Sequence, residues 1–123
     1  RWATPVNYMR RRAACDTEMG GRRIRKDDWL ILFYASGNRD EDVFDDPFRF
    51  RVDRAPNPHV GFGYGEHFCL GSHLARRSQR ALFAELARRL EHVELAGEPE
   101  WIKSSFVVGL KHLPIRYRIA RGA

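Results

Sequence analysis

Apolar residues between positions 70 and 90 recur with a helical spacing. They fall about every four residues, and most of the charged residues between them are arginines. This pattern is typical of an amphipathic helix that packs one face against a core. It predicts a helix over residues 72–90 whose buried stripe is formed by Leu70, Leu74, Leu82, Leu86 and Leu90.

Shorter apolar runs on either side predict small β-ribbons. Residues 16–35 have the pattern strand, turn, strand, with turns at Gly20–Gly21 and at residues 26–28 and a β-rich run that starts at Trp29. Segments 105–108 and 113–119 flank Gly109 and predict a hairpin near the end of the chain. Residues 36–64 show neither a helical period nor the alternation of a strand, and an irregular segment of that length is usually functional.

Composition and charge narrow the class of protein. The chain has 123 residues, 43% of them hydrophobic and 31% charged, which is typical of one packed domain. No apolar run approaches the roughly 18 residues of a membrane-spanning helix, so we expect no membrane span. Lysine and arginine total 22 against 16 acidic residues, a net charge of +6 that predicts an acidic partner. No nucleic-acid-binding motif accompanies this charge, so nucleic acid is not the expected partner.

Two further features concern the setting of the chain. Cys15 and Cys69 form no C-x-x-C pair, and so few cysteines fit a reducing, cytoplasmic compartment. The chain starts at Arg1 without an initiator methionine, and we expect it to be the C-terminal part of a longer chain.

The candidate chemistry lies in the glycine-rich segment 62–71, directly before the predicted helix. The glycines allow a tight loop that places Cys69 beside the helix N-terminus, where unpaired amides and the helix dipole favour a thiolate. Gly71 lets the backbone approach the sulfur or a flat ligand closely. A thiolate held in this way is a soft metal ligand or a nucleophile.

The residues alone leave other interpretations of Cys69 open. It is a buried structural cysteine in one of them. In another it binds zinc together with His67 and His73, although no fourth ligand is evident. In a third it is a nucleophile paired with His67, but neither an orienting partner nor an oxyanion site can be identified.

Segment 62–71 resembles the haem-binding signature of the cytochromes P-450, F-x-x-G-x-[RH]-x-C-x-G. Every fixed place of that signature is matched, by Phe62, Gly65, His67, Cys69 and Gly71. The resemblance extends from position 1 to position 119. It implies that residues 1–123 are the C-terminal fragment of a single domain of this family, mainly α with small β-ribbons, in which the haem-ligand loop leads into a long helix.

Two elements outside the loop carry the same resemblance. Arg1 is similar to the arginine of the family's E-x-x-R motif, and residues 47–50 are similar to its P-x-R-F element. The resemblance implies that Arg1 and Arg49 join a glutamate upstream of this chain in a structural charge triad. One departure is Asp27, where the family usually has glycine; we expect local strain there and no change of function.

The resemblance also implies roles in binding haem, iron protoporphyrin IX. Cys69 is the axial thiolate, and Phe62 packs against the ligand loop. His67 and Arg10 bind the propionates. The alternative for Arg10 is a solvated side chain beside Arg11 and Arg12. Ala75 lies against the haem face. The implied cofactor-binding set is Phe62, Gly63, Gly65, His67, Gly71, Ala75 and Arg10.

The implied activity is haem-dependent monooxygenation. The chain holds no catalytic residue beyond the iron ligand, because the family's central oxygen-activating helix is expected upstream. The resemblance implies a ferredoxin-type electron donor and dioxygen as the oxidant. We expect the donor to dock near the arginines at 76, 77 and 80, and a solvated basic face with internal ion pairs is the alternative role for them. A haem-thiolate binding or sensing protein without catalysis is the alternative.

Substrate contacts are implied for two segments, 4–9 and 106–108. Their side chains are apolar or aromatic, which predicts a small hydrocarbon-like substrate of terpenoid, steroid or fatty-acyl type. Ordinary core packing is the alternative role for the same side chains. The implied substrate-binding set is Val6, Tyr8, Met9, Phe106 and Val107.

Overall fold

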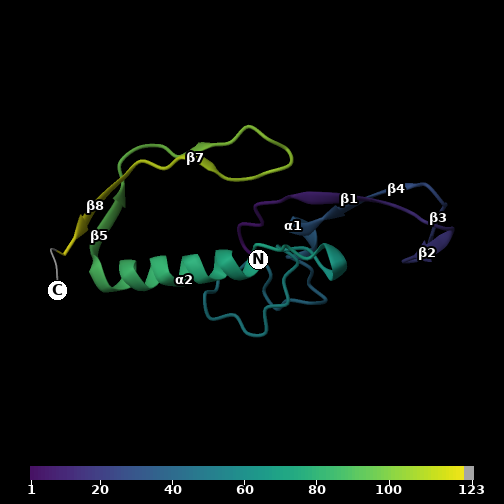
Figure 1. Cartoon of the computed structure of the whole chain (residues 1–123), viewed down its shortest axis with the longest axis horizontal. Helices are drawn as coiled ribbons and strands as arrows, with labels where there is room; N and C mark the ends of the chain where they lie inside the picture. Colours follow the sequence, from purple (N-terminus) through teal and green to yellow (C-terminus); the bar gives the residue numbers. More distant parts are fainter. Residues whose placement is uncertain (121–123) are drawn as a thin grey trace. The chain divides into compact units, whose positions relative to one another are not determined.

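The structure is a computed structural model that describes residues 1–120, and these residues form two compact units. One unit is Arg1–Gly61 together with Ser104–Val108, and the other is residues 62–103 together with residues 109 onward. Along the chain the elements (Figure 1) are β1 (Tyr8–Arg12), β2 (Thr17–Met19), β3 (Arg22–Ile24), β4 (Trp29–Phe33), α1 (Tyr34–Gly37), η1 (Gly65–His67), α2 (Ser72–Arg89), β5 (Leu90–Leu95), β6 (Glu100–Trp101), β7 (Leu110–His112) and β8 (Ile115–Ile119).

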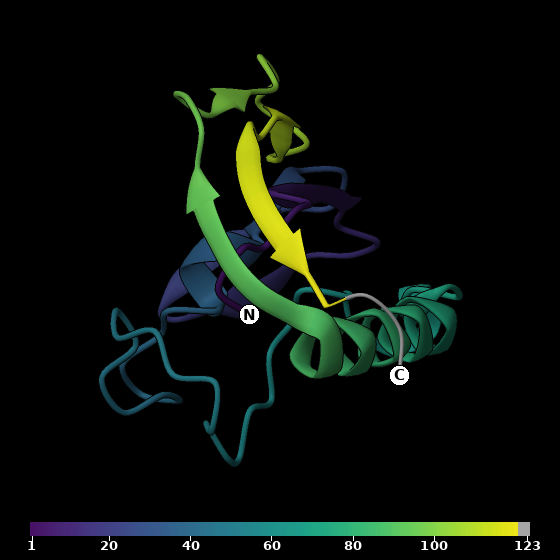
Figure 2. The same cartoon turned by 90° about the vertical axis from the view of Figure 1, so that its left-hand side faces the viewer.

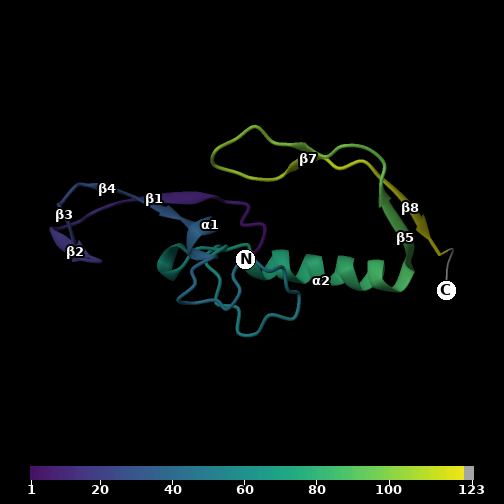
Figure 3. The same cartoon turned by 180° about the vertical axis from the view of Figure 1, so that it is seen from behind.

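The first unit is built on an antiparallel ribbon of β1 and β4. Its register pairs Tyr8 with Phe33, Arg10 with Ile31 and Arg12 with Trp29. The hairpin of β2 and β3 follows β1 along the chain and turns at two glycines with positive φ (Figure 3). The hairpin confirms the predicted turn at Gly20–Gly21. Strand β1 was not predicted, because its arginines hide the apolar alternation on which strand prediction depends.

Asp27 adopts the left-handed conformation expected at a position that favours glycine. Its φ is 73°, and its N–H donates to the carbonyl of Ala13 at 2.9 Å. Aspartate tolerates this region better than most residues. Its carboxylate also pairs with Arg12 at 3.0 Å, so the side chain has a contact that glycine would lack.

Asn38 is the centre of the polar packing in the first unit and is completely buried. Its side-chain amide donates to the Thr4 hydroxyl at 2.9 Å, and its side-chain oxygen accepts from the Val60 N–H at 2.8 Å. Its backbone carbonyl accepts from the Arg1 guanidinium at 2.6 Å. Buried polar groups need such partners, and these bonds tie the start of the chain to residue 60.

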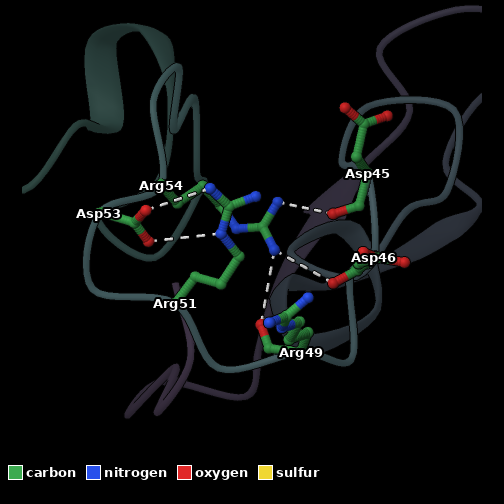
Figure 4. Close-up of polar contacts among 6 residues, drawn as sticks. All are labelled: Asp45, Asp46, Arg49, Arg51, Asp53 and Arg54. Atoms are coloured by element: carbon green, nitrogen blue, oxygen red, sulfur yellow. Dashed lines mark hydrogen bonds and ion pairs between the residues drawn. The ribbon is translucent and has the colours of Figure 1, made fainter.

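Arginines hold part of the irregular segment 36–64 in place. Arg54 donates to the backbone carbonyls of Asp45 and Asp46 at 2.7 and 3.1 Å and to that of Arg49 at 3.4 Å (Figure 4). Arg51 donates two hydrogen bonds to the Asp53 carboxylate, which hold the pKa of Asp53 below its ordinary value. Arginine thus satisfies loop carbonyls that have no strand partner.

The second unit contains the predicted helix. Helix α2 covers Ser72–Arg89, and the chain passes directly from it into β5 (Figure 1). Strand β8 lies antiparallel to β5 (Figure 2), and β6 pairs with β7. The predicted pairing of segment 113–119 with segment 105–108 is therefore wrong. Residues 115–119 instead pair with a longer partner at 90–95, of which only Leu90 had been assigned to an element, as the end of the predicted helix.

Two further expectations need correction. The apolar stripe of α2 is exposed among the described residues, with Leu74 70% and Leu82 56% accessible. Only Leu86 and Leu90 of the predicted stripe are half-buried. The class "mainly α" is also wrong for this chain, because residues 1–120 hold one 18-residue helix, one of four residues and four two-stranded sheets. The sequence underestimated the number of strands, because they are short and several contain arginines, which obscure the apolar alternation that predicts a strand.

Across residues 1–120, none of the helices has the length and apolar character needed to cross a bilayer.

We predict that Asn38→Ala destabilises the protein containing this chain. Val60 would lose its acceptor and Thr4 its donor in a buried site, so we expect the free energy of unfolding to fall by about 2–4 kcal/mol. Urea unfolding followed by circular dichroism measures this loss. Asn57→Ala is the control, because Asn57 is exposed, and it should change stability by less than about 0.5 kcal/mol. Equal effects of the two variants would contradict the role of Asn38.

Candidate functional site

Loop 62–71 is closed by backbone hydrogen bonds that present Cys69 just before α2. The Cys69 N–H donates to the Phe62 carbonyl at 2.8 Å, and the Cys69 carbonyl accepts from the Ser72 N–H at 3.1 Å. A short 3₁₀ turn inside the loop is closed by the Phe68 N–H donating to the Gly65 carbonyl at 3.0 Å. The backbone of Cys69 is thus engaged on both sides, and its side chain points out of a fixed loop.

Two glycines are required by the path of this loop. Gly63 and Gly65 have φ values of 75° and 68°, a region that other residues enter only with strain. Gly71 differs, because its φ is −78° and a Cβ built on it would lie at an ordinary 3.9 Å from the Cys69 Sγ. Neither backbone strain nor a clash with the sulfur therefore accounts for Gly71.

The donor set at Cys69 fits a flat group with a soft metal at its centre. Cys69 is a free, exposed cysteine, and a thiolate is a soft ligand. Gly71 leaves the space beside the sulfur without a side chain, as the close approach of a planar ligand needs. Apolar surface surrounds the loop, with Phe68 42% and Leu74 70% accessible. Haem matches this chemistry through one thiolate bond and a large apolar face.

The competing interpretations of Cys69 lose support in the structure. Cys69 is exposed, which argues against a buried structural cysteine. In residues 1–120 no three His, Cys, Asp or Glu side chains gather as a metal site, so His67, Cys69 and His73 do not form a zinc centre. Within the same residues no hydrogen bond joins Cys69 to His67, as activation of a nucleophile would require.

Sequence analysis missed two features near the loop: the contact between Arg76 and Phe62, and the burial of Ser72. The Arg76 guanidinium lies over the Phe62 ring, with its Cζ 4.9 Å from the ring centroid, and Phe62 meets Phe68 edge to face at 6.2 Å. Arg76 therefore braces the loop from the first turns of α2. Ser72 is completely buried, and its hydroxyl has no partner among the described residues. The i to i+14 spacing of Phe62 and Arg76 gives no sequence signal.

The remaining predicted cofactor residues fall in both units. His67 ends the 3₁₀ turn and is exposed, and Ala75 is half-buried in α2, where its N–H donates to the Gly71 carbonyl at 2.9 Å. Arg10 lies in β1 of the other unit, with its Cζ 4.0 Å from the centroid of the Trp29 ring. All three offer side chains at the surface of their own unit.

The structure brings together most of the predicted substrate residues within the first unit. Val6 and Val107 form an antiparallel bridge, and the Tyr8 and Phe106 rings meet edge to face at 5.6 Å. The Asn7 N–H donates to the Phe106 carbonyl at 2.9 Å. Met9 is separated from this group, because strand alternation places it on the face of β1 opposite to Tyr8.

Arg1 and Arg49, predicted as members of a charge triad, lie in the same unit. The Arg1 guanidinium donates to the carbonyls of Asn38 and Pro47 at 2.6 and 2.9 Å and lies over the Phe44 ring at 5.0 Å. The backbone of Arg49 is held by Asp46 and Arg54. The glutamate of the triad is expected outside this chain, so the triad itself stays a prediction.

The sequence model of cytochrome P-450 matches residues 1–119. The chain belongs to the cytochrome P-450 family, whose cofactor is haem.

Similar relatives are bacterial enzymes. Linalool 8-monooxygenase of Pseudomonas putida is 49% identical over 94% of this chain and 28% of its own length. Methyl-branched lipid omega-hydroxylase of Mycobacterium tuberculosis is 48% identical over 95% of this chain and 28% of its own. The crystal structure of CYP108D1 from Novosphingobium aromaticivorans superposes with a TM-score of 0.89 at 46% identity, covering 97% of this chain and 29% of that one. The chain thus spans little more than a quarter of the proteins it matches.

Proposed function

We propose that Cys69 is the axial thiolate of haem iron and that the protein containing this chain is a monooxygenase. The observation that carries the proposal is the free, exposed thiol held before α2 inside a complete haem-binding signature. When bound, haem supplies the activation of dioxygen and the oxidising power for hydroxylation. The contribution of this chain is to hold the sulfur, orient the cofactor and present apolar surface to the substrate.

The loop performs the first of these tasks. The bond from the Cys69 N–H to the Phe62 carbonyl fixes the backbone, and the bracing of Phe62 by Arg76 limits movement of the loop. Residues that support a metal ligand orient it, and losing such a residue typically lowers metal affinity or activity by about 10- to 100-fold. Gly63, Gly65 and Gly71 keep bulk away from the cofactor, and Ala75 offers a small side chain to its face.

Orientation of the cofactor falls to two cationic or hydrogen-bonding side chains. We assign Arg10 and His67 to the propionates, because a carboxylate removed from water favours charged donors. Both side chains are exposed in their own unit and therefore available to an anionic group. Arg1 and Arg49 take a structural role in this proposal.

We infer that the chain forms part of a single P-450 domain. The family match crosses both units, and the exposed leucines of α2 present an apolar face that a larger domain would cover. We place this domain in the cytoplasm, since two free cysteines are typical of a reducing compartment.

The proposed substrate is a small hydrocarbon-like molecule of terpenoid, steroid or fatty-acyl type. Val6, Tyr8, Phe106 and Val107 form its contact surface, which carries no formal charge. The names of two relatives, which refer to linalool and to a methyl-branched lipid, agree with this chemistry. Met9 is left out of the contact surface, because it lies on the other face of β1.

We propose a ferredoxin-type protein as the electron donor. Arg77 and Arg80 are exposed in the first half of α2, close in sequence to the ligand loop. Positive charge at such a place favours an acidic protein and speeds its association. Arg76 contributes less, because it is stacked on Phe62.

We predict that Cys69→Ser in the haem-loaded protein abolishes the red-shifted Soret band of its ferrous carbon monoxide complex, because an alcohol cannot replace the thiolate. Difference spectroscopy measures this band. Cys15→Ser is the matched control, since Cys15 is also free and exposed, and it should leave the spectrum unchanged. A thiolate-type spectrum in the Cys69 variant would overturn the assignment.

We predict that Phe106→Ala weakens binding of an apolar substrate by about 1–3 kcal/mol, or roughly 5- to 150-fold, because a buried aromatic contact is lost. The low-spin to high-spin shift of the Soret band during a substrate titration gives the dissociation constant. Phe48→Ala is the control, since Phe48 is 68% exposed in the irregular segment between α1 and η1 and lies outside the contact surface. Equal dissociation constants for the two variants would remove Phe106 from the contact surface.

We predict that the double variant Arg77→Glu and Arg80→Glu slows reduction by ferredoxin about tenfold at low ionic strength and flattens the dependence of the rate on salt. Stopped-flow reduction measures both effects. The double variant Arg88→Glu and Arg89→Glu reverses the same charge at the other end of α2, where Arg88 pairs with Glu85. The docking assignment fails if the two pairs of substitutions slow the reaction equally.

A further inference from the structure

Trp29 lies between two arginines on one face of the β1–β4 ribbon. In the register of this ribbon Arg12 is directly opposite Trp29, and Arg10 is diagonal to it on the same face. The Cζ atom of Arg10 is 4.0 Å from the centroid of the Trp29 ring, and that of Arg12 is 5.9 Å away. The ring face is therefore occupied by Arg10.

Asp27 explains why Arg10 rather than Arg12 holds this place. The Asp27 carboxylate binds the Arg12 guanidinium at 3.0 Å, which draws that charge toward the turn between β3 and β4. Two guanidinium groups over one ring would repel each other at short range. By engaging Arg12, Asp27 leaves the indole to Arg10.

Stacking leaves the hydrogen-bonding edge of Arg10 free. A guanidinium that lies on an aromatic ring keeps its N–H donors in its own plane, where they can bind a carboxylate with two bonds. Within residues 1–120 the Arg10 side chain has no ion pair with a carboxylate. An exposed arginine otherwise loses considerable rotamer freedom when it binds an anion, and the indole restricts that freedom beforehand.

We propose that Trp29 is a positioning residue for Arg10: its indole holds the guanidinium so that the N–H edge meets a carboxylate, which in the haem-loaded protein is a propionate. This proposal rests on the proposed function. It assigns a role to a residue outside the haem-binding signature, and it gives Asp27 an indirect part through Arg12.

The test is the rate at which the haem-loaded protein loses haem to excess apomyoglobin. Trp29→Leu removes the ring and should speed the loss about 2- to 30-fold, the range expected for a cation over an aromatic face. Trp29→Phe keeps a ring and should restore most of the wild-type rate. Trp101→Leu is the control, because Trp101 is similarly exposed, 61% against 59%, but lies in β6; its rate should equal that of the wild type.

A double-mutant cycle separates positioning from general damage to the ribbon. Arg10→Gln should speed haem loss at least as much as Trp29→Leu, and adding Trp29→Leu to Arg10→Gln should change nothing further. Additive effects, or a Trp29→Leu rate equal to that of the wild type, overturn the proposal. If Trp29→Leu does not fold, Trp29→Met, which keeps apolar bulk but also lacks a ring, replaces it in both backgrounds of the cycle.

The Soret band of the ferrous carbon monoxide complex keeps this result distinct from failure of the proposed function. A thiolate-type band that depends on Cys69, together with additive rates, overturns only the role of Trp29. Absence of that band in the wild-type protein overturns the haem assignment and the role of Trp29 with it.

Discussion

Burial of Asn38 is the constraint on which the first unit depends. A side-chain amide enclosed by protein must find a partner for its oxygen and for its nitrogen, and Asn38 finds them in Val60 and Thr4. Its backbone at the same time binds Arg1 and Tyr34. Through Val60 the network reaches the last residues of this unit before the chain continues into segment 62–71. Few apolar side chains are buried in this unit, so directional polar bonds define its structure more than apolar packing does.

Sequence patterns predicted what depends on local chemistry. The helix over 72–90, the turn at Gly20–Gly21 and the loop that places Cys69 before a helix each follow from spacing and backbone preference, and the structure has all three. The partners of the strands were not predictable in this way. Strand β8 pairs with β5 across a long interval of sequence, and β1 has three arginines in five residues. Which strand pairs with which depends on tertiary contacts that local periodicity does not contain.

The contacts of the arginines were likewise not predictable from the sequence. Their number predicts a basic surface, but their individual contacts divide them into different tasks. Arg54 satisfies loop carbonyls, Arg76 lies on Phe62, and Arg10 lies on Trp29. A guanidinium can be a hydrogen-bond donor, a stacking group and a charge at once, so composition alone does not show which property is used. For α2 the apolar period correctly predicted a helix, but the predicted burial of its leucines was wrong.

The placement of segment 104–108 in the first unit has a consequence for folding during synthesis. Asn7 donates to the carbonyl of Ser105, a contact between residues 98 positions apart, and Val6 pairs with Val107. The ribosome releases Val6 long before Val107, so the surface assigned to the substrate is assembled only after segment 104–108 has also been synthesised. Contacts of such high sequence separation slow folding and prolong the exposure of unpaired strand edges. The apolar residues of segment 6–8 that suit a hydrocarbon ligand therefore stay without these partners until segment 104–108 leaves the ribosome.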